Sequence, residues 1–190
     1  MTISLIGRSI KNSVTQASNV LIGNVPIYTL TSPTFFTRYG ISTSYAIIAL
    51  KDFDTTNPSA IYSSSPDVES ISKWLLHNKV PTTTELSQET FQNIMNAPNR
   101  PLVVITAVNK GNRAKVEEKM KAVGKKWKLR NGVNNGGRDV VFTWMDGEKW
   151  SKWLGSMYSL KSGSGDDDTP VVIADHSVGS YLVSIIATKR

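Results

Sequence analysis

The chain has 190 residues, of which 39% are hydrophobic and 19% are charged, a balance typical of folded domains rather than of disordered segments. The length suits one ordinary domain or two small ones. The absence of cysteine excludes disulfide bonds, thiolate metal sites and thiol nucleophiles, and no apolar run approaches the ~20 residues that a membrane-spanning helix needs.

The positive charge is concentrated in one segment. Between residues 110 and 130, nine Lys and Arg residues stand against two Glu, so this segment accounts for the whole net charge of +7. Such a stripe binds phosphates or an acidic partner in some proteins. The pattern favours a solvated helix face, because nucleic-acid-binding modules usually add exposed aromatic residues. The residues of this basic patch are Lys115, Lys119, Lys125 and Lys126.

The first half of the chain predicts a short α/β unit. Residues 1–19 are polar and weakly patterned, and they define no element. Beyond them, short apolar runs predict strands, and amphipathic segments with capping residues predict helices. The expected elements are a strand at 25–30, a helix at 33–39, strands at 45–50 and 60–62, and a helix at 66–78. Val80-Pro81 then breaks the pattern and marks a domain boundary.

The second half alternates helices and strands. The expected elements are a helix at 87–95, a strand at 102–107, the basic helix, a strand at 139–146, a helix at 148–158 and strands at 169–174 and 181–187. Val116, Met120, Val123 and Trp127 form the expected apolar side of the basic helix. Strands that alternate with helices predict a partly parallel sheet covered by helices. The sequence therefore predicts two tandem α/β domains, residues 1–81 and 82–190.

Several short motifs carry a family resemblance. The first half contains a Tyr-Gly-Ile turn at 39–41, an apolar strand, Lys-x-Phe-Asp at 51–54 and a helix ending His-Asn-x-x-Pro at 77–81. This order resembles the first non-catalytic domain of protein disulfide isomerases. Val140-Val141-Phe142, a helix and Thr169-Pro170-Val171-Val172-Ile173-Ala174 resemble the second half of a thioredoxin fold. Together, residues 20–174 resemble the tandem b and b′ domains of this family, most like fungal members.

The resemblance implies a fold, a site and partners. It implies an α/β class with two thioredoxin-like domains, each a mixed sheet flanked by helices. In this fold the proline before the penultimate strand is cis and faces a groove, and the groove of the second domain binds peptide. The expected polypeptide-binding residues are Thr169, Pro170 and Trp144. The resemblance implies that the protein resides in the endoplasmic reticulum. It implies unfolded or partly folded polypeptides and other thioredoxin-like domains as partners, and it implies no cofactor.

The departures from the family pattern exclude its chemistry. Catalytic thioredoxin domains carry Cys-x-x-Cys after the strand equivalent to 102–107, where this chain has Val108-Asn109-Lys110-Gly111-Asn112. Without thiolates there is no disulfide exchange. The first unit lacks the proline, since its position falls near Ser44-Tyr45. This unit is also expected to lack its opening strand and helix, and the second to lack its final helix, as in a truncated or mis-spliced chain. Residues 1–10 do not resemble a signal peptide.

Other patterns suggest catalysis or metal binding but lack the necessary features. Asp175-His176-Ser177 cannot form a triad, because adjacent residues at a strand end point in different directions. Asp166-Asp167-Asp168 lacks the glycine turn and distal glutamate of a calcium loop. The sequence thus predicts no catalytic residue and no metal site. The alternatives left open are a basic module for nucleic acid or an anionic surface, and a gene fragment without independent function.

Overall fold

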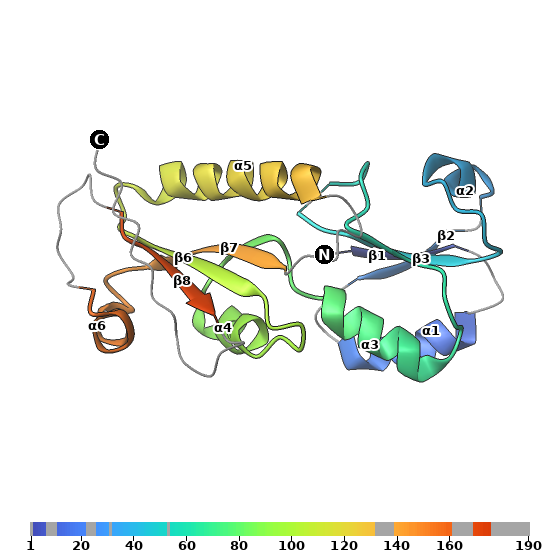
Figure 1. Cartoon of the computed structure of the whole chain (residues 1–190), viewed down its shortest axis with the longest axis horizontal. Helices are drawn as coiled ribbons and strands as arrows, with labels where there is room; N and C mark the ends of the chain where they lie inside the picture. The colour runs from blue at the N-terminus through green and yellow to red at the C-terminus, as the bar shows by residue number, and fades with distance from the viewer. Residues whose placement is uncertain are drawn as a thin grey trace. The chain divides into compact units, whose positions relative to one another are not determined.

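The computed structural model describes residues 2–6, 11–21, 26–30, 32–52, 54–131, 139–160 and 169–175. The chain folds into two compact units, one within Met1–Pro81 and one that starts at Thr82. Each unit contains a four-stranded mixed sheet flanked by helices (Figure 1). The α/β class predicted from the sequence is confirmed.

The first unit has the sheet order β2-β1-β3-β4. β1 is parallel to β2 and antiparallel to β3, and β3 is antiparallel to β4. Its elements are β1 (Thr2–Ile6), α1 (Lys11–Ala17), the 3-10 helix η1 (Ser18–Leu21), β2 (Ile27–Leu30), α2 (Thr34–Arg38), β3 (Ala46–Leu50), β4 (Ala60–Tyr62) and α3 (Val68–Asn78). β1 and α1 are an opening strand and helix, so the expectation that this unit lacks them is wrong.

The core of the first unit explains how a weakly patterned segment becomes helical. Val14, Ala17 and Leu21 are at most 2% exposed and pack with Ile71 and Leu75 of α3. The apolar residues of α1 and η1 are few and include a small alanine, but their spacing of three and four places them on one side of the helical turns. Tertiary burial therefore stabilises this helix, for which the local sequence gives little signal.

Local capping fixes two helix ends in the first unit. Gly40, with φ +63°, follows α2, and the N–H of Ile41 donates to the carbonyl of Phe36 at 2.8 Å. Glycine suits this left-handed position because it has no Cβ to clash. At the start of α3, the Asp67 carboxylate accepts a hydrogen bond from the N–H of Ser70 at 2.7 Å. The backbone hydrogen bond from Ser70 lowers the pKa of Asp67 from 3.8 to about 2.

The second unit has the sheet order β5-β7-β6-β8, in which β5, β6 and β7 are parallel and β8 is antiparallel to β6. Its elements are β5 (Thr83–Glu85), α4 (Gln88–Met95), β6 (Leu102–Val108), α5 (Arg113–Asn131), β7 (Val140–Asp146), α6 (Ser151–Tyr158) and β8 (Val171–Asp175). The sequence missed β5. The expected strand at 181–187 and the expected loss of a final helix lie outside the described residues.

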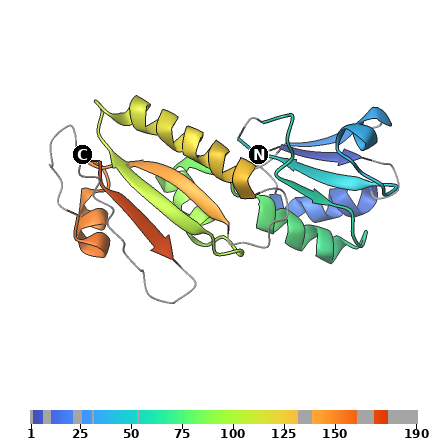
Figure 2. The same cartoon turned by 45° about the horizontal axis from the view of Figure 1, so that its top comes forward.

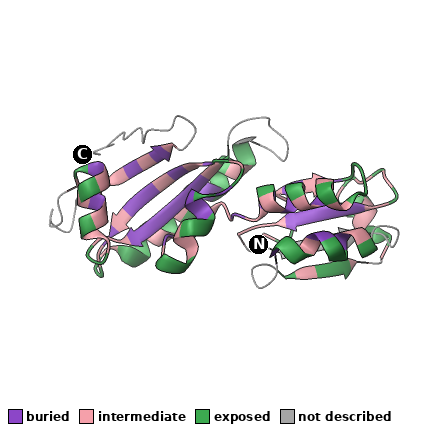
Figure 3. Cartoon of the chain, turned by 90° about the horizontal axis from the view of Figure 1, so that it is seen from below, coloured by how far each residue is buried: buried purple, intermediate pink, exposed green. Residues whose placement is uncertain are grey.

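Helices cover both faces of this second sheet. α4 and α6 lie on one face and α5 lies on the other (Figures 1 and 2). The sheet strands are largely buried, while the helices expose one side each (Figure 3). Ile105 of β6 and Met145 of β7 are fully buried. β6 and β7 are central strands with few polar residues, as expected for parallel strands that are covered on both sides.

The packing side of α5 differs from the predicted apolar stripe. Val116 is 7% exposed and Met120 packs beside it, but Val123 is 45% exposed. The buried position one turn after Met120 is Gly124, where a Cβ, if present, would lie 2.4 Å from Cγ2 of Thr83 on β5. The glycine thus lets α5 approach the edge strand closely. Trp127 is 38% exposed and contacts Phe142 edge-on, with ring centroids 6.3 Å apart.

Candidate functional site

The candidate site lies at one edge of the second sheet. The parallel strands β5, β6 and β7 all end at this edge, and β8 begins there, since Thr106 of β6 is the partner of Val171. In open α/β sheets, ligands usually bind outside the carboxyl ends of the strands, where loops from different strands meet. The loop that joins β6 to α5 and the Thr169-Pro170 segment both lie here.

Two asparagines fix the loop between β6 and α5. The N–H of Asn109 donates to Oδ1 of Asn112, and the N–H of Asn112 donates to Oδ1 of Asn109, both at 2.8 Å. The N–H of Arg113 also donates to the Asn109 carbonyl at 3.1 Å. This reciprocal pair has the form of a capping box, and it closes the turn that precedes α5. The loop that replaces Cys-x-x-Cys is therefore an ordered turn that leads into α5.

Thr169 and Pro170 lie beside this loop although they are distant in sequence. Nδ2 of Asn112 donates to Oγ1 of Thr169 at 3.4 Å, and the N–H of Ala107 donates to the Pro170 carbonyl at 3.3 Å. Asn109, Asn112, Thr169 and Pro170 are each partly exposed. We call these four residues the Asn/Thr-Pro site. The sequence analysis predicted Thr169 and Pro170 as binding residues, and the Asn-x-x-Asn spacing after a strand is the signal that could have added both asparagines.

The Thr169–Pro170 peptide bond is trans, because the described residues contain no cis peptide bond. The cis isomer implied by the family resemblance is therefore not found. The Pro170 carbonyl is bonded to β6, which fixes the segment at the start of β8.

Trp144 belongs to the core, which corrects its assignment as a polypeptide-contacting residue. It is 5% exposed and packs with Val108 and Val116, with Met120 beside them. Its Nε1 has no hydrogen-bond partner among the described residues. The ammonium of Lys121 lies 5.8 Å from the ring centroid, within the range of a cation–π contact. Trp144 thus packs against Val108, the last residue of β6 before the loop that begins at Asn109.

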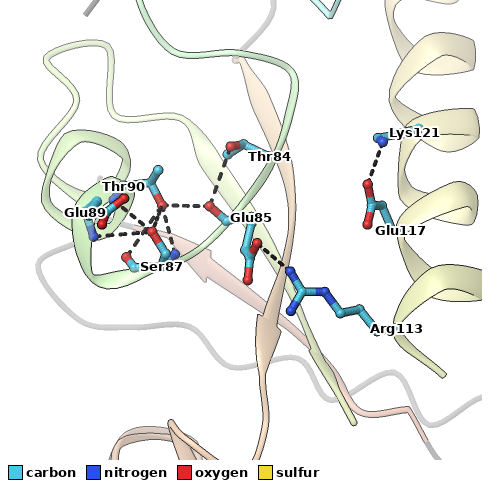
Figure 4. A network of polar contacts seen from close by, with 8 residues as sticks. All are labelled: Thr84, Glu85, Ser87, Glu89, Thr90, Arg113, Glu117 and Lys121. Carbon is cyan, nitrogen blue, oxygen red and sulfur yellow. Dashed lines mark hydrogen bonds and ion pairs between the residues drawn. The ribbon is translucent and has the colours of Figure 1, made fainter. Parts of the chain in front are cut away.

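An ion pair and a capping network join β5, α4 and α5 near the same edge (Figure 4). Arg113, at the start of α5, contacts the Glu85 carboxylate at 2.7 Å. The hydroxyl of Thr90 donates to the Glu85 carbonyl at 2.6 Å and accepts from the N–H of Ser87 at 2.9 Å. The side chain of Ser87 in turn accepts from the N–H of Thr90, which completes a capping box for α4. These contacts hold the beginnings of both helices to β5.

The basic patch lies on α5, apart from this network. Lys115, Lys119, Lys125 and Lys126 are exposed, and none of them forms an ion pair with a residue that the structure describes. Lys121, in contrast, pairs with Glu117 at 2.6 Å.

The described residues contain no group of three or more His, Asp or Glu side chains arranged to hold a metal ion. In the same part of the chain, no helix is both long and apolar enough to cross a membrane.

The fold and the site define a thioredoxin-like architecture without thiols. Residues 15–182 match the family of thioredoxin-like domains. The chain therefore belongs to the thioredoxin-like domain family. Among curated proteins, no sequence matches it.

Solved structures resemble this chain at low sequence identity. The structure is similar to the bb fragment of ERp72, with a TM-score of 0.56 and 12% identity over 99% of this chain and 82% of that fragment. It is also similar to the zinc-bound form of human ERp44, with a TM-score of 0.45 and 13% identity over 96% of this chain and 48% of that protein. The first of these similarities shows a fold shared with the ERp72 fragment.

Proposed function

We propose that this chain is a non-catalytic module of the protein disulfide isomerase family that binds unfolded or partly folded polypeptide at the Asn/Thr-Pro site. ERp72, whose bb fragment has the same fold, is a member of that family. The proposal includes two thioredoxin-like domains, residues 1–81 and 82–190, and the endoplasmic reticulum as the compartment.

The observation that carries the proposal is the contact between Asn112 and Thr169. It joins the position of the missing Cys-x-x-Cys to the segment before β8, so the two halves of the site remain together without a reactive group. Amide and hydroxyl groups both donate and accept hydrogen bonds. Partly exposed side chains of this kind match the N–H and C=O groups of an extended polypeptide, whatever its sequence.

Because the chain has no cysteine, it would bind polypeptide without disulfide exchange. Exchange requires a thiolate that attacks a disulfide sulfur, and this chain has no thiol. A bound client would therefore leave with its disulfide bonds unchanged. A module of this kind contributes by holding polypeptide or by spacing other domains.

The test is binding of a fluorescein-labelled unstructured peptide, measured by anisotropy, to the wild type and two variants. Thr169→Arg places a long side chain in the site. Thr56→Arg makes the same change at an exposed position of the first unit. Thr169→Arg should weaken binding by about tenfold, which corresponds to ~1.4 kcal/mol, and Thr56→Arg should bind as the wild type does. Equal affinity of all three proteins would contradict the site assignment, and no binding to the wild type would favour the spacing role.

A further inference from the structure

We propose that α5 carries a second interaction surface, which binds an acidic polypeptide segment through Lys115, Lys119, Lys126 and Arg130. We call these four residues the basic ridge. All four are exposed. At 3.6 residues per turn they fall within an arc of about 60° on one flank of the helix, and at 1.5 Å per residue they span about 22 Å.

No acidic residue lies within the arc of the basic ridge, although Glu118 borders it three residues after Lys115. Glu117 lies on the other flank of α5, where it pairs with Lys121 at 2.6 Å. Glu118 projects about 60° away from Lys115 around the helix axis. None of the four ridge residues makes an ion pair with a described residue. Their charges are therefore available to a partner.

The spacing of the ridge fits carboxylates on a polypeptide. Lys115 and Lys119 are one turn apart, about 6 Å along the axis, as are Lys126 and Arg130. Carboxylates at alternate positions of an extended chain repeat every ~6.6 Å, and those one turn apart on a helix repeat every ~6 Å. Val123, which is 45% exposed, borders the ridge between the two pairs. An acidic segment that includes an apolar residue would match this arrangement.

Other anionic partners fit this surface less well. Three of the four cations are lysines, which lack the bidentate geometry by which arginine recognises phosphate. The ridge itself carries no aromatic residue on which bases could stack, and the nearest one on α5, Trp127, packs edge-on against Phe142. Insertion into a lipid surface needs a continuous free apolar helix face. Val116 of α5 packs against Trp144 of the sheet, and the exposed apolar residues of the helix, Val123, Trp127 and Leu129, alternate with basic residues. The surface therefore favours an acidic polypeptide over nucleic acid or membrane.

The test compares two triple variants of the full chain with the same loss of charge. Lys115, Lys119 and Lys126 are changed to Gln in the ridge variant, and Lys11, Lys149 and Lys152 are changed to Gln in the control. All six lysines are exposed, so both variants should keep the fold, which circular dichroism checks. Binding of fluorescein-labelled poly-L-glutamate is measured at low and high ionic strength. A single-stranded RNA and vesicles containing phosphatidylserine are measured in parallel.

The ridge variant should bind poly-L-glutamate about tenfold more weakly than the wild type, and the control less than about threefold more weakly, since exposed charge pairs contribute modestly. Wild-type binding should weaken as ionic strength rises. Equal weakening of both variants would overturn the proposal, because net charge alone would then explain binding. It would also be overturned if the wild type failed to bind poly-L-glutamate at low ionic strength, or bound RNA or vesicles more tightly through the same lysines.

Discussion

Replacing Gly124 by Ala tests the close approach of α5 to β5. The added Cβ would lie 2.4 Å from Cγ2 of Thr83. This distance is more than about 1 Å shorter than an optimal carbon–carbon contact. Overpacking of this kind costs about 1–3 kcal/mol, whereas replacing glycine within a helix contributes about 1 kcal/mol in the other direction. We expect Gly124→Ala to destabilise the protein by about 1 kcal/mol.

Thr83→Ser tests whether the close contact with Cγ2 causes the expected loss of stability, because it removes Cγ2 and keeps the hydroxyl. The next nearest atoms to the new Cβ are Cγ2 of Thr82 at 3.5 Å and Cδ2 of Phe142 at 3.6 Å, which are ordinary contacts. In the Thr83→Ser background, Gly124→Ala should therefore stabilise the protein by up to about 1 kcal/mol. The double-mutant cycle should give a coupling free energy of about 1–3 kcal/mol.

Urea unfolding monitored by tryptophan fluorescence provides the assay, because four of the five tryptophans follow Thr82 in sequence. Gly155→Ala in α6 is the matched control. Its Cβ would meet only the Leu160 carbonyl oxygen, at 3.6 Å, so this substitution should stabilise by about 0.5–1 kcal/mol. If Gly124→Ala changes the free energy of unfolding equally in both Thr83 backgrounds, within about 0.5 kcal/mol, the packing argument is refuted.

Three further substitutions test individual contacts. The folded-state pKa of Asp67 is lowered from 3.8 to about 2, so the stabilising effect of its carboxylate is complete above pH 3.8 and is lost as the pH falls toward 2. Asp67→Ala should therefore destabilise the protein at neutral pH and much less at pH 2. An equal loss of stability at both pH values would contradict the role of the charge. Ser87→Ala removes the α4 capping box and should cost about 1 kcal/mol in urea unfolding, with no change arguing against the cap. Glu85→Gln breaks the exposed ion pair with Arg113 and should cost at most about 1 kcal/mol, less at high salt; a larger, salt-insensitive loss would show a different role.

The sequence predicted the elements with continuous apolar runs. β6 and β7 are buried on both faces, so their residues are almost all apolar and the pattern is strong. β5 was missed because Thr-Thr-Glu is short, polar and only partly buried at the sheet edge. α1 was missed because its stability depends on packing against α3, which the local sequence does not contain.

The candidate site could be predicted only in part. The Thr-Pro motif before a strand led to the prediction of one half of it. The contact of Thr169 with Asn112 depends on the pairing of β6 with β8, which brings together residues that are distant in sequence. Trp144 was misplaced because a strand covered by helices on both faces gives an aromatic residue no exposed side. The alternation of apolar and polar residues along a strand cannot show whether an aromatic side chain is exposed when helices cover both faces of the sheet.

Backbone chemical-shift mapping with an unstructured peptide tests the central claim most directly. If the chain binds polypeptide at the Asn/Thr-Pro site, the amide signals of Asn109, Asn112, Thr169 and Val171 should shift on titration and saturate together. Shifts confined to residues distant from Pro170, such as those of the first unit, would contradict polypeptide binding at this site.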